Sequence, residues 1–256
     1  MCLIAFAWQA HPRWRLLLLA NRDEFHARPT APLATWDGRP GMAAGRDLRA
    51  GGTWLGACAD GRVATVTNVR DPGHGGDGAS RGLLVSDYLR STQPCRAWGE
   101  ALHARDVTYR PFNLLCFDAE EACYLGNHPQ AKQRRVEPGV HGLSNADFDT
   151  PWPKTQALMQ RLTAWIEQET DAFAPLWAAL ADSGEWPDAM LPDTGVGIER
   201  ERMLSAAFIR GRDYGTRAST LVAVGHDGRV WMSERRFGPL GVFEGERTLE
   251  LCSGTG

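Results

Sequence analysis

Pairs of short apolar runs separated by turn residues recur along the chain, and they constrain its fold more than any other feature. The first pair is CLIAFAW (residues 2–8) and RWRLLLLA (residues 13–20), divided by the breaker QAHP. Apolar runs of this length, bounded by turn residues, favour strands over helices. A turn in the breaker creates an antiparallel hairpin in which Cys2 lies opposite Ala20 or Asn21.

Three further segments have the same pattern. In GGTWLGACADGRVATVTNVRD the dipeptide Asp60-Gly61 signals a type I′ turn, which places Asn68 opposite Thr53 at the open end of the hairpin. In TRASTLVAVGHDGRVWMSERRF the chain turns at Asp227-Gly228 and leaves Arg217 just beyond the paired part. The segment FNLLCFDAEEACYLGN predicts a fourth hairpin, which we interpret as structural.

Helical segments lie between these hairpins. Residues 81–90 follow Ser80, a suitable N-cap residue, and residues 95–105 have apolar side chains at helical spacing. A third helix is expected after Asp149-Thr150-Pro151, which offers a cap residue and a proline for the first turn, and a fourth over 171–182. The third has one apolar stripe, made by Leu158, Leu162, Trp165 and Ile166.

This order of elements predicts the fold class. Strand hairpins at both ends with helices in the middle indicate an α+β chain in which antiparallel sheets pack together and helices cover them. No linker divides the 256 residues, so we expect a single domain over 1–256. With 43% hydrophobic and 23% charged residues the chain has a globular rather than a disordered composition. A net charge of −3 argues against a nucleic-acid partner.

Cysteine and histidine spacings point to no metal site. The six cysteines include no C-x-x-C pair, and the seven histidines include no H-E-x-x-H motif. We therefore expect no metal and no cofactor. Scattered thiols fit a reducing compartment, and no apolar stretch approaches the roughly 18 residues of a membrane span. A cytoplasmic protein with a small-molecule substrate or ligand is the expectation; the oligomeric state is not predicted.

Cys2 is the residue with the clearest chemical interpretation. A thiol is mostly protonated at neutral pH, so a nucleophilic cysteine needs a base. If Met1 is removed, the α-amine of Cys2 titrates near ~7.7–8.0 and is suited to that task. The small side chain of Cys2 is compatible with this removal.

Partners for such a nucleophile occur in the hairpins. The first hairpin brings Arg22 and Asp23 close to Cys2, where Arg22 favours the thiolate and Asp23 orients the amine. Two asparagines, Asn68 and Asn145, offer amide donors for an oxyanion. The candidate catalytic residues are Cys2, Arg22, Asp23, Asn68, Asn145 and Arg217. The planar guanidinium of Arg217 is suited to bind the polar end of a substrate through two hydrogen bonds. The candidate substrate-binding residues are Asn21, Glu24, Trp54 and Arg70.

Each candidate also has a structural interpretation. A free cysteine packs readily as a small hydrophobe. The run Asn-Arg-Asp-Glu is also compatible with a solvent-exposed strand end, where ion pairs contribute little to stability. Asparagines are common in turns and caps, and arginine is abundant in this chain. Only the convergence of these residues on one place distinguishes a site from a set of ordinary side chains.

The motifs ANRDEFHARPTAPLATW, GGTWLG, TNVRD, GLSNADFDTPWPK and YGTRASTLV resemble those of the NRDE family, also called the transport and Golgi organisation family. The resemblance extends from Met1 to about Phe243. It implies the four-layer αββα sandwich of N-terminal nucleophile (Ntn) hydrolases, with antiparallel sheets and the residue after Met1 as nucleophile.

The same resemblance implies a cysteine-nucleophile amidohydrolase similar to penicillin acylase and bile salt hydrolase, which cleave acyl-amide C–N bonds. Those enzymes separate the early arginine and aspartate, whereas Arg22 and Asp23 are adjacent here. Because adjacent strand residues face opposite sides, one of the two, or Glu24, is expected not to reach the thiol. The start MCL lacks the glycine usual in class II glutamine amidotransferases, which disfavours that subclass.

Two alternatives stay open at this point. The family has been linked to haem and to acyl-CoA or lipid handling, so the chain is also compatible with a non-catalytic protein that binds or carries such ligands. An axial haem ligand would come from His26, His74, His141 or Cys2. The other alternative is a scaffold whose pocket is vestigial and filled by side chains.

Overall fold

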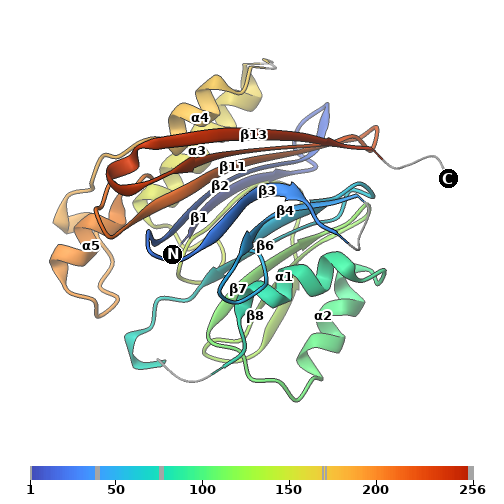
Figure 1. The fold of residues 1–256 in the computed structure, drawn as a ribbon, viewed down its shortest axis with the longest axis horizontal. Helices are drawn as coiled ribbons and strands as arrows, with labels where there is room; N and C mark the ends of the chain where they lie inside the picture. Colours follow the sequence, from blue (N-terminus) through green and yellow to red (C-terminus); the bar gives the residue numbers. More distant parts are fainter. Residues whose placement is uncertain (1, 38–40, 75–77, 169, 171, 253–256) are drawn as a thin grey trace.

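Two antiparallel sheets form the centre of the protein in the computed structural model, which describes residues 2–37, 41–74, 78–168, 170 and 172–252 (Figure 1). In spatial order, the six-stranded sheet contains β10 (Gly139–Leu143), β1 (Cys2–Trp8), β2 (Trp14–Phe25), β11 (Tyr214–Gly225), β12 (Val230–Phe237) and β13 (Phe243–Leu251). The seven-stranded sheet contains β3 (Thr30–Thr35), β4 (Met42–Asp47), β5 (Leu55–Cys58), β6 (Val63–Asn68), β7 (Phe112–Phe117), β8 (Ala122–Gly126) and β9 (Lys132–Arg135).

Helices cover the outer face of each sheet, which confirms the expected αββα order of layers (Figure 1). The seven-stranded sheet is covered by α1 (Arg81–Arg90) and α2 (Cys95–His103), and the six-stranded sheet by α3 (Pro153–Glu167) and α4 (Ala174–Leu180). The remaining helices are α5 (Ile198–Ser205) and the short 3₁₀ turns η1 (Pro72–His74), η2 (Asp188–Met190) and η3 (Pro239–Gly241).

Strand β1 explains why the first apolar run does not alternate with polar residues. Ile4 and Phe6 point into the core between the sheets, where the Phe6 and Phe117 rings lie 5.1 Å apart. Leu3 and Ala5 point to the other face and pack under the helices. A strand that is buried on both faces needs apolar residues at every position.

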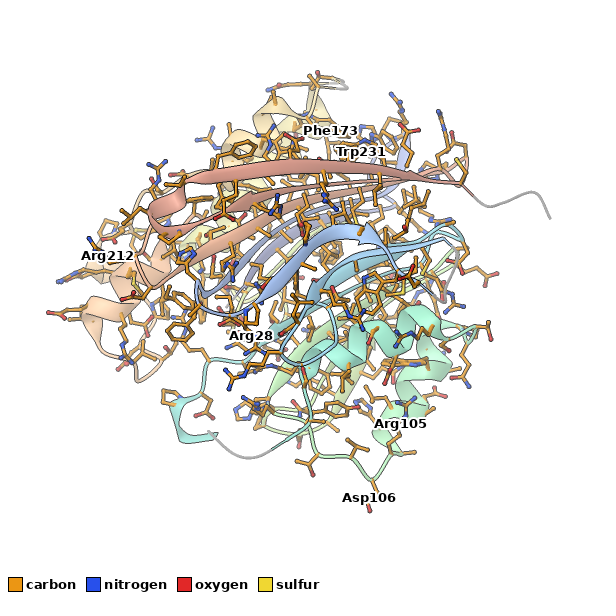
Figure 2. All side chains as sticks on the ribbon, viewed as in Figure 1. Arg28, Arg105, Asp106, Phe173, Arg212 and Trp231 are labelled. Atoms are coloured by element: carbon orange, nitrogen blue, oxygen red, sulfur yellow. The ribbon has the colours of Figure 1, made fainter. Side chains whose placement is uncertain are left out.

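The helix layer on the six-stranded sheet is held by aromatic contacts. Phe173, just before α4, and Trp231 on β12 have ring centroids 4.8 Å apart, and Figure 2 shows the two side chains together at this face.

Among the described residues, no helix combines the length and apolar character that crossing a bilayer requires.

The register of two hairpins differs by one or two residues from the expectation. Cys2 pairs with Arg22 rather than with Ala20 or Asn21. Leu55 pairs with Thr65, so Asn68 does not lie opposite Thr53.

Loop length explains the second of these differences. The predicted two-residue turn at Asp60-Gly61 is a three-residue loop closed between Cys58 and Arg62, with Gly61 at φ +84°. The hairpin of β11 and β12 has the same kind of loop, with Gly228 at φ +83°. A glycine in the left-handed region is characteristic of three-residue hairpin loops, and one extra loop residue shifts the pairing by one position.

Three helix boundaries also differ from the expectation. The helix over 95–105 ends at His103, and the helix over 171–182 covers only Ala174–Leu180. The third helix begins at Pro153 rather than at Pro151. Neither candidate cap residue caps the helix: the Asp149 carboxylate accepts the backbone N–H of Gly142 in β10 at 2.8 Å, and the Thr150 hydroxyl donates to the backbone oxygen of Asp147 at 2.7 Å.

Candidate active site

The amino-terminal end of β1 borders a cavity of about 150 Å³ at the open ends of the two sheets. The wall comes from β1, β2, β6, the segment before β5 and the start of α1. Six residues predicted from the sequence line it: Cys2, Arg22, Asp23, Glu24, Trp54 and Asn68. Segments far apart in the sequence therefore meet around the Cys2 thiol.

Arg22 lies beside Cys2 on the same face of the six-stranded sheet, because cross-strand partners share a face. Its guanidinium carbon is 4.3 Å from the centre of the Trp54 ring, and Nη2 is 3.8 Å from Glu24 Oε2. The side chain is buried, and Nη1 has no hydrogen-bond partner among the described residues. A buried cation with an unused donor is suited to a polar ligand group.

The electrostatics of the cavity keep Cys2 in its thiol form. Burial raises the pKa of the Cys2 thiol, and the nearby carboxylates of Asp23 and Glu24 raise it further, whereas the positive charge of Arg22 lowers it. The thiol is therefore not spontaneously ionised at neutral pH. A nucleophilic Cys2 needs a base to accept its proton.

Asp23 is fully enclosed at the same end of β2. Its Oδ1 accepts a hydrogen bond of 2.6 Å from the Thr216 hydroxyl on β11. Burial raises the pKa of the Asp23 carboxyl, while the positive charges of Lys154 and Arg22 oppose that effect. Like Asn21, Asp23 neighbours Arg22 in β2 and leaves the strand on the face opposite Arg22, where Thr216 fixes the orientation of its carboxylate. Asp23 nevertheless lines the cavity, because it lies near the end of the strand.

Asn145 and Asn68 form a hydrogen-bonded pair in which Asn145 is the donor. Asn145 Nδ2 donates to the backbone oxygen of Asn68 at 2.9 Å and to its Oδ1 at 3.0 Å. Both amide hydrogens of Asn145 are thereby used. Asn68 lines the cavity, and its own Nδ2 makes no hydrogen bond to the described residues.

Ser144 connects this pair to β1. The Ser144 hydroxyl donates to the backbone oxygen of Cys2 at 3.0 Å, and the Thr67 hydroxyl donates to the backbone oxygen of Ser144 at 2.7 Å. The segment after β10 thus bridges the start of β1 and the end of β6. It sets the position of Asn68 relative to the thiol.

Four predicted residues do not line the cavity: Asn145, which reaches it only through Asn68, and Asn21, Arg70 and Arg217. Asn21 lies farther from the end of β2 than the residues of this strand that line the cavity. It neighbours Arg22 in β2 and so faces the helix layer instead. Its Nδ2 donates to the backbone oxygens of Leu180 and Ala207, at 2.8 and 2.7 Å, and its Oδ1 accepts from Ser219 at 2.6 Å. These bonds use the whole amide and tie β2 to the end of α4 and the segment after α5.

Arg70 and Arg217 also lie outside the wall of the Cys2 cavity. Arg70 Nη1 is 2.7 Å from Glu201 Oε2 on α5, and its guanidinium stacks 4.8 Å from the centre of the Trp152 ring. Arg217 sits at a bulge of β11 against β2, and its Nη1 donates to the backbone oxygens of Phe25 and Arg28. It holds the segment that connects β2 to β3.

A second cavity of about 80 Å³ lies next to the first and shares Arg22 and Trp54 with it. Arg217 and Arg236 line this second cavity together with Glu234. Glu234 Oε1 accepts the backbone N–H of Leu33 at 2.8 Å, and Oε2 has no hydrogen-bond partner among the described residues. Burial raises the pKa of Glu234 to about 7.

Sequence reasoning missed several residues at the Cys2 cavity. Arg81 and Arg110 line it, as does the ion pair between Arg28 Nη2 and Asp47 Oδ2, 2.7 Å apart. Arg28 lies within the motif that follows the Asn-Arg-Asp-Glu tetrad, which was the one available signal. Nothing in the local pattern points to Arg81 or Arg110, because tertiary packing brings them to the cavity: Arg81 at the start of α1 and Arg110 in the segment before β7.

The histidines considered as haem ligands are placed elsewhere. Both ring nitrogens of His141 are engaged, Nδ1 with Asp149 Oδ2 at 2.8 Å and Nε2 with the Glu137 backbone oxygen at 2.9 Å. His26 does not line the Cys2 cavity. The side chain of His74 lies outside the described residues.

The chain is similar in sequence to a known protein family over most of its length. The family model described as Transport and Golgi organisation 2 matches residues 1–239. The Transport and Golgi organization protein 2 homologs of Bos taurus and Homo sapiens are 34% and 32% identical to this chain, and each alignment covers 92% of both proteins. The Drosophila melanogaster Transport and Golgi organization protein 2 is 26% identical, with 91% of both covered.

Among solved structures, the chain is similar to a Caenorhabditis elegans N-acylethanolamine-hydrolyzing acid amidase ortholog. The TM-score is 0.44 at 11% identity, covering 86% of this chain and 92% of the other. A similarity of this degree leaves the chemistry of this chain undecided.

Proposed function

The chain belongs to the Transport and Golgi organisation 2 family, and we propose that it is an N-terminal cysteine amidohydrolase that cleaves acyl-amide C–N bonds. Cys2 is the nucleophile once Met1 has been removed. The observation that carries this proposal is the cavity in which Cys2, Arg22, Asp23 and Asn68 meet.

The reaction begins with proton transfer from the Cys2 thiol to its own α-amine. The sulfur then attacks the carbonyl carbon of the amide, and the carbonyl electrons move onto oxygen. When the tetrahedral intermediate collapses, the C–N bond breaks and the leaving amine takes the proton back from the α-ammonium. Water, activated by the same amine, hydrolyses the acyl thioester and restores the thiol.

Asn68 is the proposed oxyanion donor, since its Nδ2 has no other hydrogen bond within the described part of the chain. Asn145 is a positioning residue, because both of its amide hydrogens are directed at Asn68. A preorganised donor of this kind costs little reorganisation when charge develops on oxygen.

Arg22 and Asp23 complete the machinery. Arg22 stabilises the thiolate, as the effect of its charge on the pKa of Cys2 indicates, and its free Nη1 is available to the substrate. In this proposal Asp23 orients the α-ammonium, and the hydrogen bond from Thr216 fixes the carboxylate. Arg217 supports the loop after β2 rather than the substrate in this assignment.

The alternative of haem binding finds less support. A haem macrocycle is larger than the cavity of about 150 Å³, and His141 is committed to other bonds. Titration with haem tests this alternative directly: a Soret shift that is lost in Cys2→Ala would favour it over hydrolysis.

The decisive experiment combines intact-mass analysis with a Cys2→Ala variant. We expect the purified protein to lack Met1, Cys2 to be its fastest thiol toward iodoacetamide, and the variant to lose hydrolysis across a panel of N-acyl amides. Cys252→Ala is the matched control, because Cys252 is an exposed thiol far along the chain. Retention of Met1 on a hydrolytically active protein, or unchanged hydrolysis by Cys2→Ala, would refute the mechanism.

A further inference from the structure

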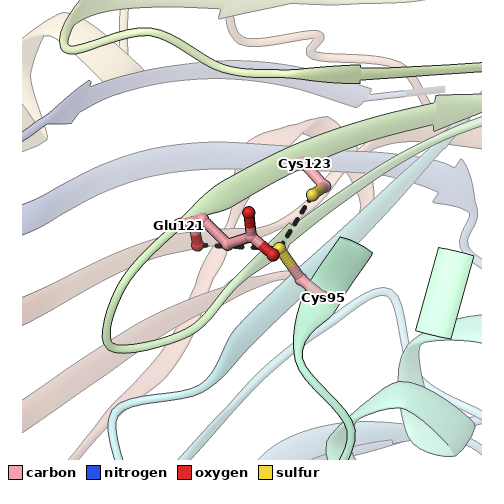
Figure 3. Close-up of side chains that lie close together, drawn as sticks. All are labelled: Cys95, Glu121 and Cys123. Atoms are coloured by element: carbon pink, nitrogen blue, oxygen red, sulfur yellow. Dashed lines mark hydrogen bonds between the residues drawn. The ribbon is translucent and has the colours of Figure 1, made fainter. Parts of the chain in front are cut away.

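A second group of cysteines lies on the outer face of the seven-stranded sheet, in the core beneath α1 and α2. Cys95 is the first residue of α2, and Cys123 lies on β8. Their sulfurs are 2.8 Å apart, as the dashed line in Figure 3 marks. We propose that Cys95 and Cys123 form an oxidisable dithiol that closes to a disulfide under peroxide.

The distance between the sulfurs distinguishes a disulfide from a metal site. A disulfide bond is about 2.04 Å long, so closure requires the sulfurs to approach by less than an ångström. Two thiolates on one tetrahedral zinc, each about 2.3 Å from the metal, stand roughly 3.8 Å apart. The Glu121 carboxylate lies within 4.8 Å of both sulfurs, but its Oε1 already accepts the backbone N–H of Arg96 at 3.2 Å.

The backbone around the pair is held in place by Asp118. Its Oδ2 accepts the backbone N–H of Cys95 at 2.8 Å, and its Oδ1 accepts those of Glu120 and Glu121 at 2.9 Å each. One carboxylate therefore fixes both the start of α2 and the turn that leads into β8. The two thiols face each other from supported positions rather than from mobile loops.

A third thiol makes the prediction more specific. Cys116 on β7 is the cross-strand partner of Cys123 and belongs to the same buried cluster. No hydrogen bond joins Cys116 to either neighbour among the described residues, whereas Cys95 and Cys123 are in direct contact. The geometry thus selects Cys95–Cys123 over Cys116–Cys123.

Small oxidants can approach the pair from the side of Cys123. A surface hollow beside β8 and β9 is lined by Cys123 and Glu121, together with side chains such as Arg96 and Arg134. In the reaction, one sulfur attacks hydrogen peroxide and becomes a sulfenic acid as the first water leaves. The second sulfur displaces the hydroxyl as the second water, so two electrons and both thiol protons pass to the peroxide.

The groups around Cys95 also affect the rate of its oxidation. The hydrogen bond to Cys123, together with burial, raises the pKa of Cys95, and the thiolate is the reactive species. Oxidation is accordingly slow near neutral pH and accelerates as the pH rises. The resulting bond ties α2 to β8 and is expected to raise the thermal midpoint by a few degrees.

The test uses the full chain exposed to hydrogen peroxide, followed by iodoacetamide alkylation and peptide mapping. We expect a cross-linked peptide pair containing Cys95 and Cys123, with Cys116 still alkylated. Cys95→Ser and Cys123→Ser each remove the cross-link, while Cys116→Ser and Cys252→Ser retain it. Because the mapping is done first on the unaltered protein, a variant that fails to fold does not decide the result.

Three outcomes would overturn the proposal. The first is full alkylation of both Cys95 and Cys123 after peroxide treatment at elevated pH. The second is a cross-link between Cys116 and Cys123. The third is stoichiometric zinc in the purified protein that is lost in Cys95→Ser, which would make the cluster a metal site.

Discussion

The Cys2 cavity and the Cys95–Cys123 pair show how differently one fold can surround a thiol. Cys2 lies at a strand end among charged and amide groups, with Arg22 on the same sheet face. Cys95 and Cys123 lie in an apolar layer, where each has the other sulfur as its nearest polar partner. Burial raises the thiol pKa at Cys2 and at Cys95, so burial alone does not separate them.

What separates the two regions is the set of groups that can accept or stabilise charge. The Cys2 cavity is lined by a cation, an aspartate and an asparagine amide. In the other region the direct partner of the Cys95 thiol is a second thiol, and the carboxylates of Asp118 and Glu121 are already bonded to backbone N–H groups. The first set of groups is the basis of the proposed acyl transfer, and the second is the basis of the proposed thiol oxidation.

After loss of the nucleophile itself, the largest effect is expected from removing the proposed oxyanion donor. Asn68→Ala should lower kcat for amide hydrolysis by about 10²–10³-fold, because one preorganised donor is lost. Steady-state kinetics on the best N-acyl amide measure it. The Cys95–Cys123 cross-link should form as before; a loss of both properties would mean that the substitution disturbs the whole fold.

Glu234 should make the stability of the Cys2 end depend on pH. Its pKa rises from 4.5 in the unfolded chain to about 7 in the folded protein, so the folded state holds the proton more tightly. Stability falls as the pH rises from 4.5 through 7, by about 3 kcal/mol at most.

Urea unfolding at pH 5 and pH 8 measures this dependence. In Glu234→Gln the fall across that interval should be smaller than in the unaltered protein by about that amount. An identical fall in both proteins would show that Glu234 is ionised in the fold. Cys95→Ser, which alters the other region, should leave the pH dependence unchanged.

Arg22 is expected to have a smaller effect on reactivity. Since its positive charge lowers the pKa of Cys2, Arg22→Gln should raise that pKa and slow alkylation of Cys2 about tenfold at neutral pH. The pH dependence of the iodoacetamide rate, read by peptide mapping, checks this. Alkylation of Cys95 and Cys123 should be unaffected, and a shift at all three thiols would contradict a local charge effect.

The smallest effect is expected from Cys95→Ser in the reduced protein. A buried hydroxyl in place of a thiol costs about 1–2 kcal/mol of stability, since the new polar group lies in an apolar layer. Denaturant unfolding under reducing conditions measures the cost, and amide hydrolysis should stay unchanged. A change in hydrolysis would mean that the two regions are coupled.

The sequence predicted most of the elements that build the site. The hairpins, α1 and the apolar stripe of α3 follow from local periodicity and turn residues, and they lie near their expected positions. The polar α5 was not predicted, because its sequence IERERMLS has no apolar stripe; it is stabilised instead by the buried pair of Glu201 and Arg70.

The site itself was predicted only in part. The grouping of Cys2 with Arg22, Asp23 and Asn68 follows from where the hairpins end, and all four line one cavity. The sequence also predicts that Asn21 and Arg217 lie beside Cys2, because both occur at the ends of predicted hairpins. Side-chain direction and a bulge in β11 send those two residues elsewhere.

By itself, the sequence determined which segments become strands and that a cysteine begins the first of them, because periodicity and turn chemistry act over a few residues. Only the tertiary structure decided which face each polar residue occupies, since a register shift of one residue exchanges the two faces of a strand. It also decided that Cys95 meets Cys123, because no local pattern encodes the packing of α2 on β8.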